Sequence, residues 1–138
     1  MKIDLSCPIE LWHFKLPRED DPNVSLQLFN LGDRPVSSVL AAFLCFDEEG
    51  HHLSRQLERV QGLDAQPRSA FEIVVDVEDG LRSAAMDFII EKVWFEDGTV
   101  WRRGSGPMSE YRPNRLEPSR QLDLLRQLAG ADALGYPS

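Results

Sequence analysis

Residues 36–60, VSSVLAAFLCFDEEGHHLSRQLERV, contain the pattern that decides the fold. Residues 36–46 form a long, mostly apolar run of strand character, and the acidic stretch 47–50, which ends in Gly50, is typical of a hairpin connection. Residues 52–60 then return as a more polar strand, which favours an edge position in a sheet. This stretch therefore predicts an antiparallel strand pair.

Five further segments have the length and composition of strands, and each is bounded by Gly, Pro, Asp or Asn. They cover residues 9–16, 24–30, 71–77, 86–96 and 99–103. No helical periodicity lies between them, so a sandwich or barrel is favoured over alternating strands and helices. The sequence predicts an all-β protein in which residues 1–103 form an immunoglobulin-like antiparallel β-sandwich of about seven strands.

The C-terminal third has a different pattern. Residues 104–118 are rich in Gly, Ser, Pro and Arg, and we expect them to form an extended linker. Ser119 is a suitable N-cap and Gly130 a suitable stop for a short amphipathic helix over residues 119–130. Its apolar residues recur at helical spacing, at Leu122, Leu125, Leu128 and Ala129. We expect this helix to pack on the sandwich or on a partner, followed by a tail, residues 131–138, that looks truncated.

The charge of the chain restricts its partners. A formal net charge of −8 argues against nucleic acid and anionic membrane, which are bound by excess Lys and Arg. Residues 101–138 carry a net charge of +2 and residues 1–100 therefore −10, so the basic tail is expected to lie against the acidic body or to contact a partner. No apolar stretch has the length of a membrane span, and the first residues do not resemble a secretory signal. A cytoplasmic location is the resulting expectation.

Cys7 and Cys45 are the two cysteines, too few for a disulfide framework or a four-thiolate metal site. We expect both to be free thiols, and Cys45, inside an apolar run, to pack as a small hydrophobic side chain. A bridge between the two is the alternative.

The stretch from Asn30 to Gly50 resembles the FxLYD family of small prokaryotic immunoglobulin-like domains. The family pattern is an Asn-rich turn with a Gly and a Pro, then a strand that ends in the naming motif. Here that motif reads FLCFD over residues 43–47, so Phe43 and Asp47 match, whereas Cys45 and Phe46 replace the usual Leu and Tyr. The resemblance, over about residues 24–77, implies a bacterial interaction or structural module and no catalytic residues.

The acidic hairpin raises the question of a metal. Asp47, His51 and His52 are weak candidates for ligands, because carboxylates and imidazoles can share a divalent ion. Adjacent histidines on an extended chain point to opposite faces, so the sequence favours a solvated hairpin without a metal. No nucleophile motif or cofactor loop is present, and we expect no catalytic residues, no cofactor and no enzyme activity.

The last hairpin offers the sharpest candidate for a binding site. A two-residue turn at Asp97-Gly98 would place Trp94 directly opposite Trp101 and Lys92 opposite Arg103, all on one face. Because Val93, Phe95 and Val100 would face the core, these four residues form a predicted partner-binding surface. The alternative is that the helix covers the tryptophans.

The strand over residues 36–46 is apolar on both faces, so its second face also needs a cover. The expected function is a non-enzymatic module that binds a protein partner or a second copy of itself through an outer sheet face, for example as a homodimer. A small-ligand or divalent-metal-binding domain, or an accessory domain of a larger polypeptide, is the alternative function.

Overall fold

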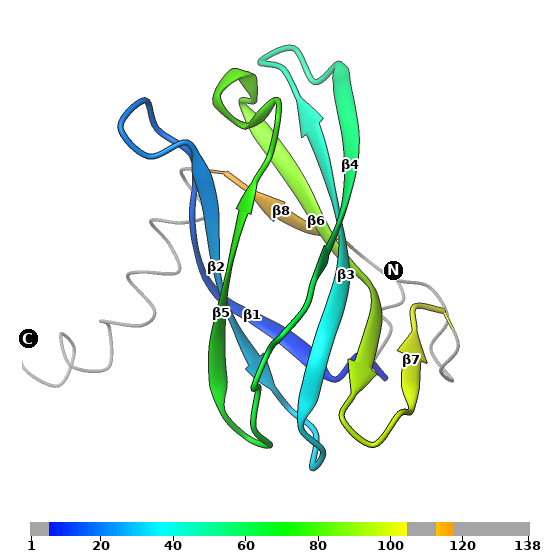
Figure 1. Ribbon diagram of the computed structural model, residues 1–138. Helices are drawn as coiled ribbons and strands as arrows, with labels where there is room; N and C mark the ends of the chain where they lie inside the picture. Colours follow the sequence, from blue (N-terminus) through cyan, green and yellow to red (C-terminus); the bar gives the residue numbers. More distant parts are fainter. Residues whose placement is uncertain (1–5, 105–112, 118–138) are drawn as a thin grey trace, which may run out of the picture.

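The computed structural model describes residues 6–104 and 113–117, which form two antiparallel β-sheets packed face to face (Figure 1). The all-β sandwich is therefore confirmed, and the seven predicted strands are each present within about two residues of their expected bounds. The strands are β1 (Ile9–Lys15), β2 (Asn23–Asn30), β3 (Val36–Phe46), β4 (His52–Val60), β5 (Ala70–Asp76), β6 (Ala85–Phe95), β7 (Val100–Arg102) and β8 (Asn114–Leu116).

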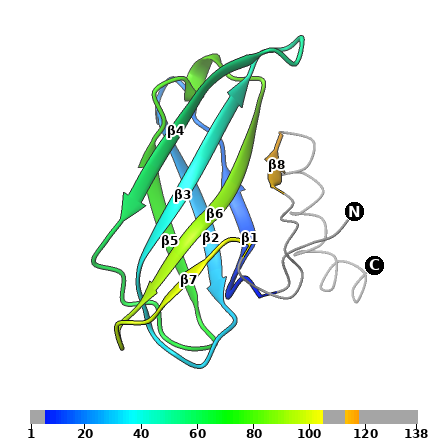
Figure 2. The ribbon, with the colours of Figure 1, turned by 90° about the vertical axis from the view of Figure 1, so that its right-hand side faces the viewer.

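The first sheet has the order β1-β2-β5, and the second has the order β4-β3-β6-β7, with β8 also paired to β6. The expected edge position of β4 is confirmed, because β4 pairs with β3 alone among the described strands. Figure 2 looks at the outer face of the five-stranded sheet, with β3, β4, β6 and β7 in front of β1, β2 and β5. No described segment crosses that face in this view.

The core lies between the sheets and follows the alternation of the strands. In β2, Val24, Leu26 and Leu28 are fully buried, while the intervening Gln27 is exposed. In β3, alternate residues from Val39 to Cys45 enter the same core, where the Phe43 ring packs 5.4 Å from the Phe88 ring. Period-two alternation thus directs one side of each strand inward.

Of the predicted linker over residues 104–118, the structure describes residue 104 and residues 113–117, which include a short strand. Asn114–Leu116 pairs antiparallel with Met86–Phe88, so β8 occupies the edge of β6 beyond the short strand β7. The Leu116 side chain is fully buried and belongs to the core. The sequence did not predict this strand, because three residues are too few to show a strand pattern.

Asn30 joins the two sheets at one end of the sandwich. Its buried side-chain Nδ2 lies 2.9, 3.1 and 3.2 Å from the carbonyl oxygens of Arg34, Ala65 and Gln66, which share its two N–H donors. Its Oδ1 accepts a hydrogen bond of 2.9 Å from the backbone N–H of Gly32. One amide therefore satisfies polar groups from two separate loops.

The side chain of Gln56, on the edge strand β4, bridges to the other sheet. Its Nε2 donates to the carbonyl oxygen of Asp76 at 2.8 Å, and its Oε1 accepts from the N–H of Glu78 at 2.9 Å. These two hydrogen bonds connect β4 to the end of β5. Among the described strands, β4 and β5 belong to different sheets and are not paired through their backbones.

Neither Cys7 nor Cys45 forms a disulfide, as predicted: Cys7 is half-buried and Cys45 is fully buried in the core. The predicted helix over 119–130 and the tail over 131–138 lie outside the described residues. Within the part of the chain that the structure describes, no helix has the length and apolar character needed to cross a membrane.

Candidate interaction surface

The last hairpin differs in register from the sequence prediction. Val93 pairs with Trp101 and Trp94 with Val100, so Trp94 and Trp101 are not opposite each other. The loop contains three residues, Glu96 to Gly98, because the Phe95 N–H bonds to the carbonyl oxygen of Thr99 and Gly98 adopts a φ of 89°. A type I turn followed by a left-handed glycine shifts the register by one residue.

This shift separates the four predicted site residues. Trp94 and Lys92 lie on the outer face, where Lys92 pairs with Arg102 and not with Arg103. Trp101 points to the opposite face, packs against the core and donates its Nε1–H to Ser6 Oγ at 2.8 Å. Arg103 forms an ion pair with Glu91. The prediction of one four-residue surface is therefore wrong, although Trp94 and Lys92 remain on the outer face.

The outer face of the five-stranded sheet is apolar along its middle. Residues directly opposite each other in an antiparallel ladder share a face. Ala42 of β3 is opposite both Leu57 of β4 and Ile89 of β6, and Leu40 and Leu44 flank it on the same side. Leu57 is 47% exposed, and Leu40, Leu44 and Ile89 are half-buried. The second apolar side of β3 is thus left partly open to solvent among the described residues.

Cations surround this apolar strip. Leu40 is opposite Arg59 and Lys92, whereas Leu44 is opposite Arg55 on β4 and Asp87 on β6, so positive groups follow the apolar row along β4 and flank one end of it on β6. We call the whole set the basic-apolar face. It comprises Leu40, Leu44, Phe46, Leu57, Ile89, Trp94 and Val100 together with Arg55, Arg59, Lys92, Arg102 and Arg115.

Two arginines of this face lie over aromatic rings. The guanidinium carbon of Arg59 is 4.1 Å from the centre of the Trp94 ring, and that of Arg115 is 4.8 Å from the centre of the Phe46 ring. Arg115 also pairs with Asp87, whose hydrogen bond raises the pKa of the guanidinium. These cation–π contacts hold the arginine side chains along the sheet surface.

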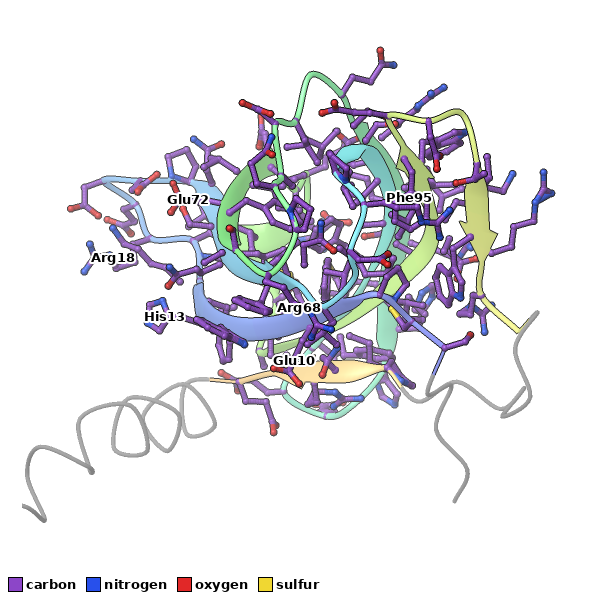
Figure 3. All side chains as sticks on the ribbon, turned by 90° about the horizontal axis from the view of Figure 1, so that it is seen from below. Glu10, His13, Arg18, Arg68, Glu72 and Phe95 are labelled. Atoms are coloured by element: carbon purple, nitrogen blue, oxygen red, sulfur yellow. The ribbon has the colours of Figure 1, made fainter. Side chains whose placement is uncertain are left out.

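The outer face of the other sheet has a different character. Trp12 is an extra residue at a bulge in β1, and its ring stacks on Phe29 at 4.3 Å with an interplanar angle of 9°. Its Nε1–H donates to the carboxylate of Glu10 at 2.8 Å. Figure 3 shows Glu10 and Glu72 on the side of the molecule formed by β1, β2 and β5. This face is acidic, and its largest aromatic side chain already has an internal partner.

The weak metal candidates are only partly brought together. Ligand atoms of Asp47, Glu49 and His51 lie within 4.8 Å of one another, whereas the ring of His52 packs edge-on against Phe46 at 5.7 Å. Asp47 Oδ1 accepts the backbone N–H groups of Glu49 and His51 at 2.9 and 2.8 Å. The carboxylate therefore stabilises the hairpin turn itself, which accounts for its position without an ion.

This turn predicts a pH dependence. The N–H groups of His51 and then Glu49 hold the pKa of Asp47 below its usual value of 3.8. A lowered pKa means that Asp47 stabilises the fold above about pH 4 and loses this contribution as the pH falls through the folded-state pKa. We expect the free energy of unfolding to fall less steeply between about pH 4 and pH 2 in Asp47→Asn than in the unchanged protein.

Urea unfolding at several pH values measures this slope. Glu48→Gln is the matched control, because it removes one negative charge from the same turn and leaves the Asp47 hydrogen bonds in place. Equal slopes in Asp47→Asn and Glu48→Gln would contradict the assigned role of Asp47.

Comparison with known proteins supports the fold and no more. No protein-family profile and no curated protein matches the sequence. A solved structure of a hypothetical protein from Peptoclostridium difficile is similar over 86% of this chain and 98% of its own, with 11% identity and a TM-score of 0.57. A putative ApaA protein from Bordetella pertussis is similar over 79% of this chain and 90% of its own, with 15% identity and a TM-score of 0.45.

Proposed function

We propose that this chain is a non-enzymatic protein-interaction module that binds an acidic partner through the basic-apolar face. The observation that carries the proposal is the partly exposed row of Leu40, Leu44, Leu57 and Ile89 between arginines, on a chain whose net charge is −8. Apolar and aromatic side chains next to Arg are enriched at the energetic centres of interfaces. An amphipathic helix with leucines on one side and carboxylates beside them fits both parts of the face.

Charge favours a different protein over a second copy. In a symmetric dimer through this face, Arg55, Arg59 and Lys92 of one copy would meet the same residues of the other. Like charges brought together in an interface weaken it. A contact between the basic-apolar face and the acidic outer face of β1, β2 and β5 would be heterologous and would not close into a dimer. The earlier homodimer prediction is therefore the less favoured form of the proposal.

We also propose the finer features of the fold. An immunoglobulin constant-type sandwich places its first, second, fourth and fifth strands in one sheet. Here β4 pairs with β3, and the order is otherwise the same, which supports an immunoglobulin-like classification. The likeness to FxLYD domains and the amphipathic helix over residues 119–130 remain predictions from the sequence.

The test uses two synthetic peptides of equal length. Both repeat leucine at helical spacing; one has glutamate at the flanking positions and the other has lysine. We expect the glutamate peptide to bind at least about tenfold more tightly at low salt, and the difference to shrink as salt screens the arginines. Fluorescence anisotropy of labelled peptide measures both affinities.

Leu57→Glu places a negative charge in the middle of the face and is expected to weaken binding of the glutamate peptide by at least about tenfold. Val74→Glu is the matched control, because Val74 is 53% exposed on the outer face of the other sheet. Equal affinities of the two peptides, or equal losses from Leu57→Glu and Val74→Glu, would refute the proposal.

A further inference from the structure

A hollow of about 760 Å³ lies at the end of the sandwich, and none of its lining residues belongs to the basic-apolar face. It is bordered by the end of β1 and the loop after it, by the short 3₁₀ helix Gly80–Arg82 and by the adjoining ends of β6 and β8. His13 and Arg18, both labelled in Figure 3, are among its lining residues. Its apolar lining consists of Leu16, Pro17, Leu81, Ala84, Met86 and Leu116.

The wall is held in place by close packing. A Cβ atom on Gly80 would lie 2.8 Å from Cγ of Pro17, so the glycine lets the 3₁₀ helix approach the chain after β1. Leu81 is 53% exposed beside it, on the border of the hollow. Leu81 thus adds exposed apolar area to the lining of the hollow.

The cations at the rim do not select an anion. Lys15 Nζ lies 3.4 Å from the carboxylate of Asp21, and Arg18 Nε lies 3.6 Å from that of Asp20. Both cations are thus balanced by acids of their own loop. The hollow can therefore recognise an occupant mainly through its apolar lining, which favours leucine side chains over a charged small molecule.

The chain itself supplies such side chains. Leu116 borders the hollow, and the next leucine in the chain is Leu122. Leu122 follows Glu117 by five residues, and five fully extended residues span no more than about 18 Å. Leu122, Leu125 and Leu128 recur at helical spacing and would form one apolar stripe. A short tether gives such a segment an effective concentration of about 1 mM at its own body, well above that of most free ligands.

We infer that residues 119–130 dock as a helix into this hollow of the same chain, with the leucine stripe against Leu81 and Met86. This placement leaves the basic-apolar face free for a partner. It replaces the expectation that the helix covers Trp94, because the segment leaves the body at the hollow and not at the centre of that face. The inference does not depend on the proposed function.

Amide hydrogen exchange of the full chain tests the inference. We expect amides of residues 122–129 to exchange at least about tenfold more slowly than an unstructured peptide, and Leu81→Asp to remove this protection. Leu57→Asp is the matched control: Leu57 is similarly exposed, at 47%, but lies on the basic-apolar face, and the protection should persist. Absence of protection, its survival in Leu81→Asp, or its loss in Leu57→Asp would each overturn the inference.

A second readout reports from the hollow. Leu125→Asp should shift the NMR signal of the Met86 methyl group, because Met86 lies in the lining, and an unchanged signal would overturn the docking. Both experiments are repeated at a tenfold lower protein concentration. Protection that falls on dilution would show that the helix docks on a second copy, which would also overturn the inference.

Discussion

Asn30→Ala is expected to lower the free energy of unfolding by about 3 kcal/mol, because both N–H donors and the Oδ1 acceptor of a buried amide are lost together. The N–H of Gly32 loses its acceptor, and the carbonyl oxygens of Arg34, Ala65 and Gln66 lose a shared donor. Each net bond contributes about 1 kcal/mol, and a buried group left without a partner costs more. Urea unfolding should show the midpoint fall by about 2 M.

Gln27→Ala is the control, since Gln27 is an exposed residue of the same strand and its loss should cost less than about 0.5 kcal/mol. Asn30→Asp adds a second test, because its carboxylate would face three carbonyl oxygens and only the protonated form can donate. The pKa of that carboxyl would rise on folding, so the variant should gain stability as the pH falls and lose it as the pH rises. A midpoint for Asn30→Ala within error of that for Gln27→Ala would contradict the stabilising role of the Asn30 hydrogen bonds.

Leu116→Ala is expected to cost about 3 kcal/mol, because it removes a fully buried leucine from the core and leaves a cavity. This leucine belongs to β8, which pairs with β6 through only three residues. The truncation should therefore also weaken the β8 pairing, so that amides of residues 114–116 exchange faster than those of β3. Urea unfolding and hydrogen exchange measure the two effects.

Leu31→Ala is the matched control, since Leu31 is 37% exposed and its truncation should change stability by less than about 0.5 kcal/mol. A similar small change in Leu116→Ala would mean that residues 114–116 are the extended linker that the sequence predicts, and that the domain ends at β7.

The strands could be predicted because their signals are local. Alternation in residues 24–30, the bounding Pro35 and Gly50 and the unbroken apolar run of residues 36–46 each act over a few neighbouring residues. The two-sided apolar character of β3 also indicated, correctly, that its outer face would be apolar. The arginines around that face could not be assigned to it, because their position depends on the pairing of β4 and β6 with β3.

The predicted binding site is wrong because the register of the last hairpin differs by one residue from the predicted register. Asp97-Gly98 is compatible with a two-residue turn, but the third loop residue, Glu96, places Trp101 opposite Val93. The carboxylate of Asp97 accepts hydrogen bonds from both the side chain and the N–H of Thr99, which lowers its pKa, and Arg34 binds the same Thr99 hydroxyl. The three-residue turn is therefore accompanied by a contact from Arg34, which belongs to a distant loop. A pattern of neighbouring residues in the sequence cannot reveal such a contact.

The sequence by itself determined the strands, the side of β2 that faces the core and the apolar outer face of β3, since these follow from side chains a few residues apart. The tertiary structure alone decided three things: the register that separates Trp94 from Trp101, the pairing of β8 and the arginines that surround Leu57. Each depends on which backbones lie side by side, and such contacts join residues far apart in the chain, where composition and spacing carry no information.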